Sequence, residues 1–234
     1  MANINKGIPM IWFSGDKHFF HDFMLWGKKQ CAQCGKPLRR QDVHADGQSL
    51  CCAAEVLAPE PPPRPGFKDV WQMNSTIVKN HNDRVAKGDV HYELGDLGLK
   101  CTPQALRDIR YEMKGNWYFV NGNHDQVAEE IPDAFVWMKD LVRISPKGFE
   151  VPPIVLCHYA MRVWHGSHKG TWQLYGHSHG NLPEEPQWLS FDVGVDANDF
   201  CPVSLEDVIK RMKPKIEAWK EWKAKLKKPG GVGW

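Results

Sequence analysis

The stretch WYFVNGNHD, residues 117–125, decides the fold prediction because an apolar run ends abruptly in polar side chains that can bind metals. WYFVNG is typical of a buried strand that ends at Gly122. Asn123, His124 and Asp125 follow it directly. This order of strand, glycine and polar residues recurs along the chain, so the strand ends are the first candidates for a functional site.

Four further segments show a short apolar run followed by a candidate ligand. They are MIWFSG (10–15) before Asp16 and His18, VHYELG (90–95) before Asp96, PIVLC (153–157) before His158, and WQLYG (172–176) before His177 and His179. WLSFDVGV (188–195) is a last apolar stretch. Helices are expected after Asp69, after Thr102-Pro103 and after Ser204, with Pro214 separating the last of these from a final helix, 215–228.

Alternation of strands and helices predicts an α/β core, and such sheets place their sites at the carboxyl ends of the strands. The strand-end donors are carboxylate, imidazole and amide groups, which suit Mn²⁺, iron or Zn²⁺ better than a metal that prefers thiolates. Residues two apart in an extended segment project to the same side, so the pairs Asp16/His18 and His177/His179 can each reach one site. The donors are too many for one catalytic ion that keeps an open position, which predicts two metals.

The ordered series D-x-H, G-D, G-N-H-D, H and G-H-S-H resembles the signature of the calcineurin-like metallophosphoesterases, in particular their small bacterial and bacteriophage members. HNDRVAKGDVHYELGDLG (81–98), CHYAMRVWHG (157–166) and FDVGVDANDFCPVSLEDVI (191–209) extend the resemblance. It covers nearly the whole chain except a cysteine-rich insertion and the last helix. The resemblance implies a single domain over residues 1–234, built as a two-sheet αββα sandwich around a dinuclear metal centre.

The resemblance also implies a role for each motif residue. Asp16, His18 and His179 would hold the first metal, Asn123, His158 and His177 the second, and Asp96 would bridge the two. A hydroxide generated at two such metals would attack phosphorus in line with the leaving group. His124 would protonate the departing oxygen, with Asp125 orienting it. His21 is a candidate contact for substrate phosphate, and an ordinary surface histidine is the alternative.

Residues 28–65 interrupt this pattern and are predicted to form an inserted lobe that ends in the proline-rich linker PEPPPRPG (59–66). Within CAQCGKPLRRQDVHADGQSLCC (31–52), Cys31 and Cys34 resemble half of a zinc knuckle. Cys51 and Cys52 would complete a structural Zn²⁺ site, with His44 competing with Cys52 as the fourth ligand. A lobe this short cannot bury a core of its own, which is the situation in which a metal is needed.

The predicted function is a metal-dependent phosphoester hydrolase, a phosphomonoesterase or phosphodiesterase. A nuclease or cyclic-nucleotide phosphodiesterase is one alternative. A non-catalytic binding or regulatory module that uses the zinc lobe and the basic C-terminal helix and tail, residues 214–234, is another. The net charge of +2 gives no strong overall attraction to nucleic acid or to a membrane, so a nucleic-acid partner would depend on that basic segment.

The predicted location is the cytoplasm, with no membrane association. No apolar run approaches the roughly 20 residues that a membrane helix needs, and the N-terminus MANINKGIPM lacks a signal segment. The seven cysteines are an odd number and include two pairs at metal-ligand spacing, as expected in a reducing compartment.

Overall fold

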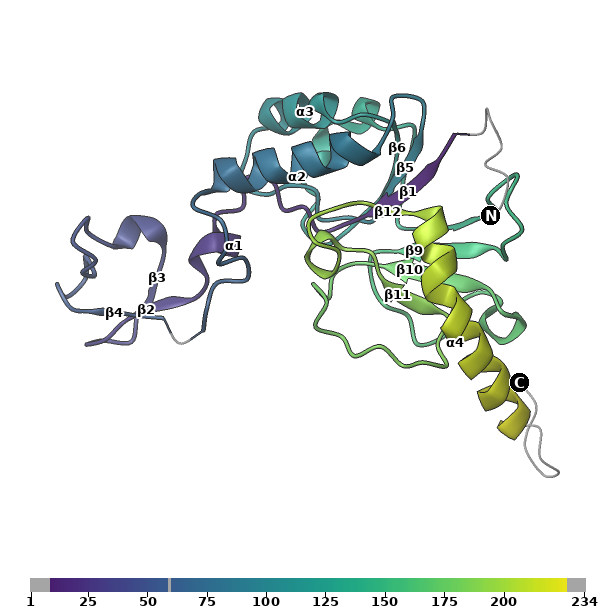
Figure 1. Ribbon diagram of the computed structural model, residues 1–234. Helices are drawn as coiled ribbons and strands as arrows, with labels where there is room; N and C mark the ends of the chain where they lie inside the picture. The colour runs from purple at the N-terminus through teal and green to yellow at the C-terminus, as the bar shows by residue number, and fades with distance from the viewer. Residues whose placement is uncertain (1–8, 59, 227–234) are drawn as a thin grey trace. The chain divides into compact units, whose positions relative to one another are not determined.

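A computed structural model describes residues 9–58 and 60–226 (Figure 1). The chain is a mixed α/β protein with three sheets. It divides into two compact units, one made of the described residues up to Lys17 and from Thr76 onward, the other of residues 18–75. The predicted insertion, 28–65, lies inside the second unit. Helix α2 (Val70–Arg84) begins in the second unit and ends in the first.

The first unit contains a five-stranded sheet in the order β12-β1-β5-β6-β7. Its strands are β1 (Ile11–Ser14), β5 (Val90–Glu93), β6 (Asn116–Val120), β7 (Met138–Lys139) and β12 (Val203–Ser204). Strands β1, β5, β6 and β7 are parallel, and only the edge strand β12 is antiparallel to its neighbour. The strands predicted from MIWFSG, VHYELG and WYFVNG are therefore confirmed as parallel neighbours, and their carboxyl ends share one edge.

A four-stranded sheet in the order β11-β10-β9-β8 completes the first unit. Its strands are β8 (Leu141–Ile144), β9 (Ile154–Cys157), β10 (Trp172–Tyr175) and β11 (Ser190–Asp192). Strands β9, β10 and β11 are parallel, and β8 is antiparallel to β9. The strands predicted from PIVLC and WQLYG are confirmed as β9 and β10. Strand β11 lies in the apolar stretch WLSFDVGV, and β8 was not predicted.

Both sheets contribute to one apolar core. It contains Phe13 of the first sheet and Leu94 directly after β5, Leu156 and Phe191 of the second sheet, and Leu205 at the start of helix α4, all without exposed surface. Because strands from both sheets bury side chains in the same core, their carboxyl ends can meet at one site. A parallel bridge between Gly15 and Gly194 joins the two sheets at that end.

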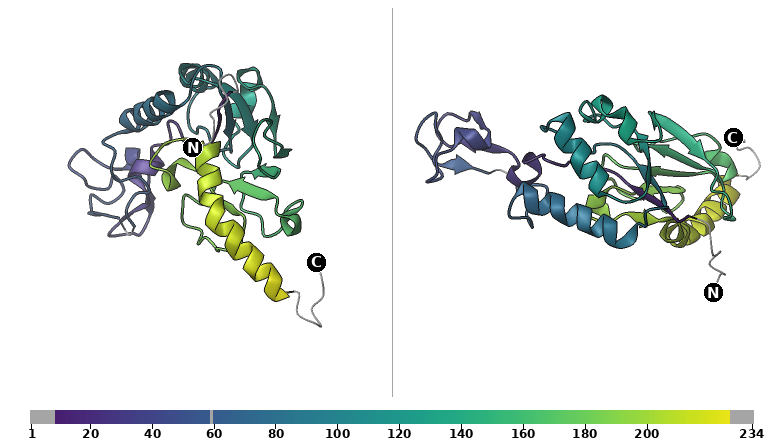
Figure 2. Two further views of the ribbon diagram at one scale, coloured as in Figure 1. Left: turned by 45° about the vertical axis from the view of Figure 1, so that its right-hand side comes forward. Right: turned by 90° about the horizontal axis from the view of Figure 1, so that it is seen from above.

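Helix α3 (Pro103–Glu112) and the part of α2 from Thr76 lie beside the first sheet in every view (Figure 2). The predicted caps are confirmed. Thr102 Oγ1 accepts the Ala105 N–H at 3.1 Å, and Asp69 Oδ1 accepts the Gln72 N–H at 2.8 Å. Each such cap stabilises a helix start by about 1 kcal/mol. Short 3₁₀ helices occupy Arg40–Asp42, Ala128–Glu130, Pro132–Ala134, Ser167–Lys169 and Val195–Ala197.

The C-terminal segment differs from the prediction. One helix, α4 (Leu205–Leu226), runs through Pro214, so the expected break into two helices is wrong. Proline removes one backbone hydrogen bond, but its fixed φ is helical, and buried Met212 and Lys215 on either side of it keep both halves packed. Residues 227–234 of the predicted tail lie outside the described residues.

Within the described ranges no helix is long and apolar enough to cross a membrane.

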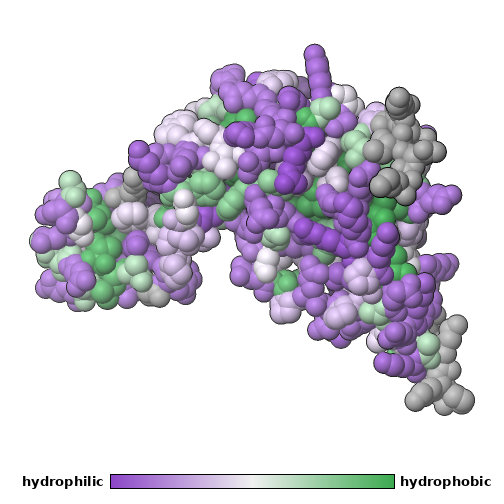
Figure 3. Space-filling model, in the orientation of Figure 1, coloured by the Kyte–Doolittle hydropathy of each residue, from purple (hydrophilic) through white to green (hydrophobic). Residues whose placement is uncertain are grey.

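The second unit contains a three-stranded sheet in the order β3-β2-β4, made of β2 (Lys29–Cys31), β3 (Pro37–Leu38) and β4 (Val56–Leu57). A single-turn helix, α1 (Phe23–Trp26), precedes it. Hydrophobic side chains reach the surface of this unit (Figure 3), and Leu50 is 52% exposed. Strands of two or three residues cannot enclose a core, so this sheet needs another source of stability.

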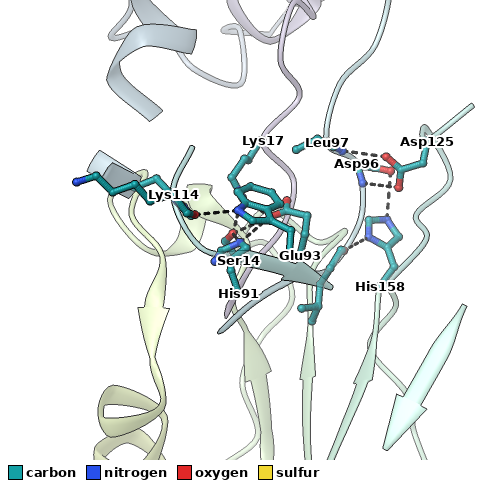
Figure 4. A network of polar contacts seen from close by, with 12 residues as sticks. Ser14, Lys17, His91, Glu93, Asp96, Leu97, Lys114, Asp125 and His158 are labelled. Atoms are coloured by element: carbon teal, nitrogen blue, oxygen red, sulfur yellow. Dashed lines mark hydrogen bonds and ion pairs between the residues drawn. The ribbon is translucent and has the colours of Figure 1, made fainter. Parts of the chain in front are cut away.

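Beneath the strand ends of the first unit lies a buried polar cluster (Figure 4). The Lys17 ammonium is paired with Glu93, and Ser14 Oγ donates to Glu93 Oε2 at 2.8 Å. The His91 ring lies 3.1 Å from the same carboxylate oxygen through Nε2. His81 Nε2 donates to the Lys114 carbonyl at 2.9 Å, and its ring centroid lies 4.7 Å from that of His91. This region of the core therefore contains two buried imidazoles next to a buried cation.

We expect this cluster to make the first unit sensitive to acid. Burial, with His91 and Lys17 adding to it, lowers the pKa of His81 from 6.5 to about 2. The unfolded chain therefore binds a proton at His81 below pH 6.5 that the folded chain excludes until about pH 2. Stability should fall as the pH drops through this window, by up to about 1.4 kcal/mol per pH unit for this histidine. Urea unfolding at pH 7, 6, 5 and 4 measures the slope.

In this urea series, His81→Gln should make the free energy of unfolding depend less steeply on pH between pH 6 and pH 4. The decrease should correspond to about one proton fewer taken up on unfolding. His168→Gln, a change at an exposed histidine, should leave the slope as it is. Equal slopes for the unmodified protein and His81→Gln would contradict the prediction.

Candidate metal centre

The predicted ligands of the second metal meet in the structure. One ligand atom each of Asp96, His158 and His177 lies within 4.8 Å of the other two, so the three could hold a metal ion. Asn123 joins them, because its Oδ1 lies 3.0 Å from His158 Nε2. Asp96 follows β5, Asn123 follows β6, His158 follows β9 and His177 follows β10. Four strands from two sheets thus deliver one cluster of donors.

A second cluster forms beside the end of β1. Asp16 follows this strand, and one of its carboxylate oxygens lies within 4.8 Å of a ring nitrogen of His179. The Asp16 carboxylate also accepts the His177 backbone N–H at 2.9 Å. These contacts fix the chain after β10 against the chain after β1. His18 is the first residue of the second unit and follows Asp16 by two positions in the chain.

Five of the seven predicted ligands have a left-handed backbone. The φ angles are +57° at Asp16, +50° at His18, +55° at Asp96, +66° at His177 and +48° at His179. Residues other than glycine adopt this conformation in only a few per cent of cases, and it costs about 1–3 kcal/mol each. Such strain is retained where the surrounding structure imposes it, and it gathers at functional sites. Five of the ten described non-glycine residues with positive φ are therefore predicted ligands.

Two glycines permit the close approach of these turns. A Cβ at Gly176 would lie 2.5 Å from Asp16 Oδ2, and a Cβ at Gly122 would collide with Asp96 Oδ1. These two glycines before predicted ligands therefore allow a close approach of the backbone to a carboxylate. Any larger residue at these two positions would displace a predicted ligand.

Asp16 has the electrostatic character of a ligand that needs a cation. Burial raises the pKa of Asp16 well above its usual range, and the neighbouring Asp192 and Asp96 add to the rise while His179 opposes it. Burial also lowers the pKa of His158, which keeps its imidazole neutral. A neutral imidazole and a desolvated carboxylate are the forms in which these side chains bind a divalent metal.

Hydrogen bonds fix the ring orientation of two of the predicted histidine ligands. His158 Nδ1 donates to the Leu94 carbonyl at 2.7 Å, so its Nε2 is the nitrogen that faces Asn123 and Asp96 (Figure 4). His179 Nδ1 lies 2.6 Å from Asp196 Oδ2. A histidine whose second nitrogen is held by a carbonyl or a carboxylate is the usual arrangement of metal-binding imidazoles. The donors therefore fit divalent metals.

His124 and Asp125 lie next to this cluster. His124 donates its backbone N–H to Asp96 Oδ1 at 2.9 Å. The Asp125 carboxylate accepts backbone N–H groups from Gly122 at 2.6 Å, Asp96 at 2.8 Å and Leu97 at 2.9 Å. Asp125 thus ties the end of β5 to the end of β6, a role that the sequence did not suggest. Its predicted action on the His124 ring stays a prediction.

His21 lies in the second unit and is buried there. Its ring centroid is 5.4 Å from that of His18 and 5.7 Å from that of Phe23. His21 also donates its backbone N–H to the His18 carbonyl at 3.1 Å. The local chain therefore holds His21 beside a predicted ligand, and its contact with phosphate remains a prediction.

The second unit contains a cluster of four cysteines that could bind a metal. The sulfurs of Cys31, Cys34, Cys51 and Cys52 lie within 4.8 Å of one another. The Cys34 and Cys51 sulfurs are 3.7 Å apart, close to the roughly 3.8 Å edge of a tetrahedron with Zn–S bonds of about 2.3 Å. All four thiols are free. Of the two candidates for the fourth ligand, Cys52 joins the cluster and His44 does not.

Tight turns present these sulfurs. The Cys31 N–H donates to the Lys36 carbonyl at 3.0 Å, and Gly35, with φ of +68°, donates to the Cys31 carbonyl at 2.9 Å. The second turn closes through the Ala53 N–H and the Ser49 carbonyl at 2.8 Å, so adjacent Cys51 and Cys52 both reach the cluster. A hydrogen bond from the buried Ser49 hydroxyl, 3.2 Å from Cys31 Sγ, lowers the pKa of the Cys31 thiol to about 6.

Comparison with known proteins shows the family of the chain but not its activity. No family model matches the sequence. A protein of Methanocaldococcus jannaschii, described as uncharacterized protein MJ1445, is 30% identical over 150 residues that span 62% of this chain and 77% of that protein. The chain belongs to the MJ1445 family. The MJ1445 name carries no function, so the chemistry of the family has to be argued from the site.

A solved structure of another protein supports the fold of this chain, a relative of MJ1445. The crystal structure of AQ665 from Aquifex aeolicus, a protein of unknown function, aligns with a TM-score of 0.56 at 18% identity. The alignment covers 87% of this chain and 99% of AQ665. At this level of identity the likeness concerns the fold alone.

In this member of the MJ1445 family, sequence reasoning missed the acidic residues that support the ligand loop. Asp192 accepts the Ser178 hydroxyl at 2.8 Å and the backbone N–H groups of Gly180 at 3.0 Å and Gly194 at 2.7 Å. It thereby holds the loop that contains His177 and His179, while Asp196 orients the His179 ring. Both acids lie in FDVGVDAND (191–199), at the end of an apolar stretch. That position was the signal available in the sequence.

Proposed function

We propose that the chain is a metal-dependent phosphoester hydrolase with a dinuclear centre, of the calcineurin-like metallophosphoesterase type. One observation carries the proposal: carboxylate, imidazole and amide donors from five strand ends gather in two adjacent clusters, and five of the seven have a strained left-handed backbone. Two mixed sheets that share one core, with helices beside them, support the αββα sandwich that this type of enzyme has.

In this proposal Asp16, His18 and His179 hold one metal and Asn123, His158 and His177 the other, with Asp96 between the two. Carboxylate, imidazole and amide donors favour Mn²⁺, with iron or Zn²⁺ as alternatives. Two such ions, when bound, acidify a water and stabilise the charge of the phosphoryl oxygens. Buried Asp16 and Asp96 provide the negative charge that retains the ions, and Asp192 and Asp125 hold the loops that carry the ligands.

His124 is the proposed general acid. Its backbone N–H is bound to the Asp96 carboxylate, so the residue is fixed at the edge of the cluster while its side chain is only half-buried. From this position the imidazolium can give a proton to the oxygen that leaves phosphorus. The product alcohol then departs neutral, which lowers the barrier most for leaving groups that are poor on their own.

The test of the proposed function is hydrolysis of phosphoesters by the Mn²⁺-loaded protein, compared with His124→Ala. We expect His124→Ala to lower kcat for an alkyl phosphate by about 10²–10⁴-fold and for 4-nitrophenyl phosphate by much less, because nitrophenolate leaves without a proton. Metal content by mass spectrometry should be unchanged. Equal losses on both substrates would remove the general-acid role, and no hydrolysis of any phosphoester by the unmodified protein would remove the function.

We propose a structural Zn²⁺ for the four-cysteine cluster of the second unit. The sulfur spacing, the two tight turns and the presence of four free thiols support it. The sheet of this unit has strands of only two or three residues, so a metal that joins its two turns would supply the stability that a core cannot.

A further inference from the structure

An exposed tyrosine stands beside the second ligand cluster. Tyr159 is 45% exposed although it directly follows buried His158. Its ring centroid lies 4.9 Å from that of His158 and 4.8 Å from that of His177, with the ring edge-on to both imidazoles. Its hydroxyl lies 3.5 Å from Asn123 Oδ1. One aromatic side chain thus contacts three predicted ligands from the solvent side.

The chain that carries Tyr159 is held rigidly. Gln173, in the middle of β10 and without exposed surface, donates through Nε2 to the Tyr159 carbonyl at 2.9 Å. Its Oε1 accepts the Met161 N–H at 3.1 Å. At the other end of the same loop, buried Trp164 donates through Nε1 to the Thr171 carbonyl at 2.9 Å. The exposed ring therefore projects from a fixed backbone, which lowers the entropy cost of binding against it.

The position of Tyr159 indicates which part of a bound phosphoester its ring would meet. Its hydroxyl reaches Asn123, and the next residue in the chain is His124, the proposed acid. The leaving group must lie on the His124 side of phosphorus to receive a proton from it. A ring at this place would therefore meet the leaving group rather than the phosphoryl oxygens, which belong with the metals.

We propose that Tyr159 is a specificity-determining residue that selects phosphoesters whose leaving group carries a planar aromatic ring, such as an aryl group or a nucleobase. This inference rests on the proposed function, because it needs phosphate at the metal centre. An aromatic side chain stacks on any planar ring through its π face, with little demand for particular hydrogen bonds.

The experiment compares two ligands that the protein cannot hydrolyse because their P–C bond is stable. Benzylphosphonate mimics phenyl phosphate, and ethylphosphonate mimics methyl phosphate, with the same charge. Calorimetry on the Mn²⁺-loaded protein gives the dissociation constant of each. We expect Tyr159→Ala to raise the dissociation constant of benzylphosphonate by about tenfold, which is the lower end of the range for aromatic stacking. The dissociation constant of ethylphosphonate should change by less than about twofold. Tyr159→Phe should bind both ligands as the unmodified protein does.

Tyr111→Ala is the matched control, because Tyr111 is an exposed tyrosine on α3 and should change neither constant. Equal weakening of both ligands by Tyr159→Ala, or no preference of the unmodified protein for benzylphosphonate, would overturn the inference. Loss of the preference in Tyr159→Phe would overturn it too, since the hydroxyl rather than the ring would then be responsible. A protein that shows the preference but hydrolyses no phosphoester would support the role of Tyr159 and contradict the proposed catalysis.

Discussion

Replacement of Asp96 by asparagine is expected to abolish phosphoester hydrolysis, with a loss of at least about 10²–10³-fold in kcat. Asp96 is the proposed bridge between two metals, and an amide has neither the charge nor the second anionic oxygen that a bridge requires. The fold should survive, because asparagine keeps the oxygen that accepts the His124 N–H. Metal content by mass spectrometry, measured beside initial rates, should fall below two ions per centre.

Asp108→Asn is the control for this change, because Asp108 is an exposed carboxylate on α3. It should keep both the metals and the activity. If Asp96→Asn hydrolysed phosphoesters as fast as the unmodified protein, the dinuclear centre would not be the catalyst.

Replacement of Cys34 by serine is expected to remove zinc from the second unit and to unfold its three-stranded sheet. Structural Zn²⁺ contributes about 10–16 kcal/mol to the folded state of small zinc peptides, far more than strands of two or three residues can replace. Zinc per chain should drop from one to zero at the cysteine cluster. Limited proteolysis should then cut within residues 28–58, while the first unit stays protected.

Cys101→Ser provides the comparison, because Cys101 lies outside the cluster and should leave zinc content and proteolysis unchanged. A Cys34→Ser protein that kept its zinc, or a second unit that stayed resistant to protease without it, would contradict a structural metal.

The sequence was sufficient for the elements that have strong local signals. The runs before Asp16, Asp96, Asn123, His158 and His177 are short, apolar and bounded by glycine or polar residues, and all five are strands. The edge strands β7, β8 and β12 were missed. They are short or half-exposed, and neighbouring strands rather than their own residues fix them. Pro214 gave a misleading signal, because packing on both sides of it outweighs the loss of one hydrogen bond.

The candidate site likewise contains residues that the sequence predicted and residues that it did not. Its donors were predicted because carboxylates and imidazoles at strand ends carry their chemistry in the residue type. The supports were not predicted, because each depends on tertiary contact. Asp196 meets His179 across 17 positions of the chain, and Gln173 meets Tyr159 across 14. Pairing of this kind has no local pattern, so it emerges only when the two sheets are assembled.

The most direct test of the dinuclear centre is the initial rate of 4-nitrophenyl phosphate hydrolysis by the metal-stripped protein as Mn²⁺ is added back. The proposed function predicts no hydrolysis before Mn²⁺ is added, a rate that rises to saturation as the centre fills, and no response from Asp96→Asn. A rate that did not depend on Mn²⁺, or that was the same for Asp96→Asn and the unmodified protein, would contradict it.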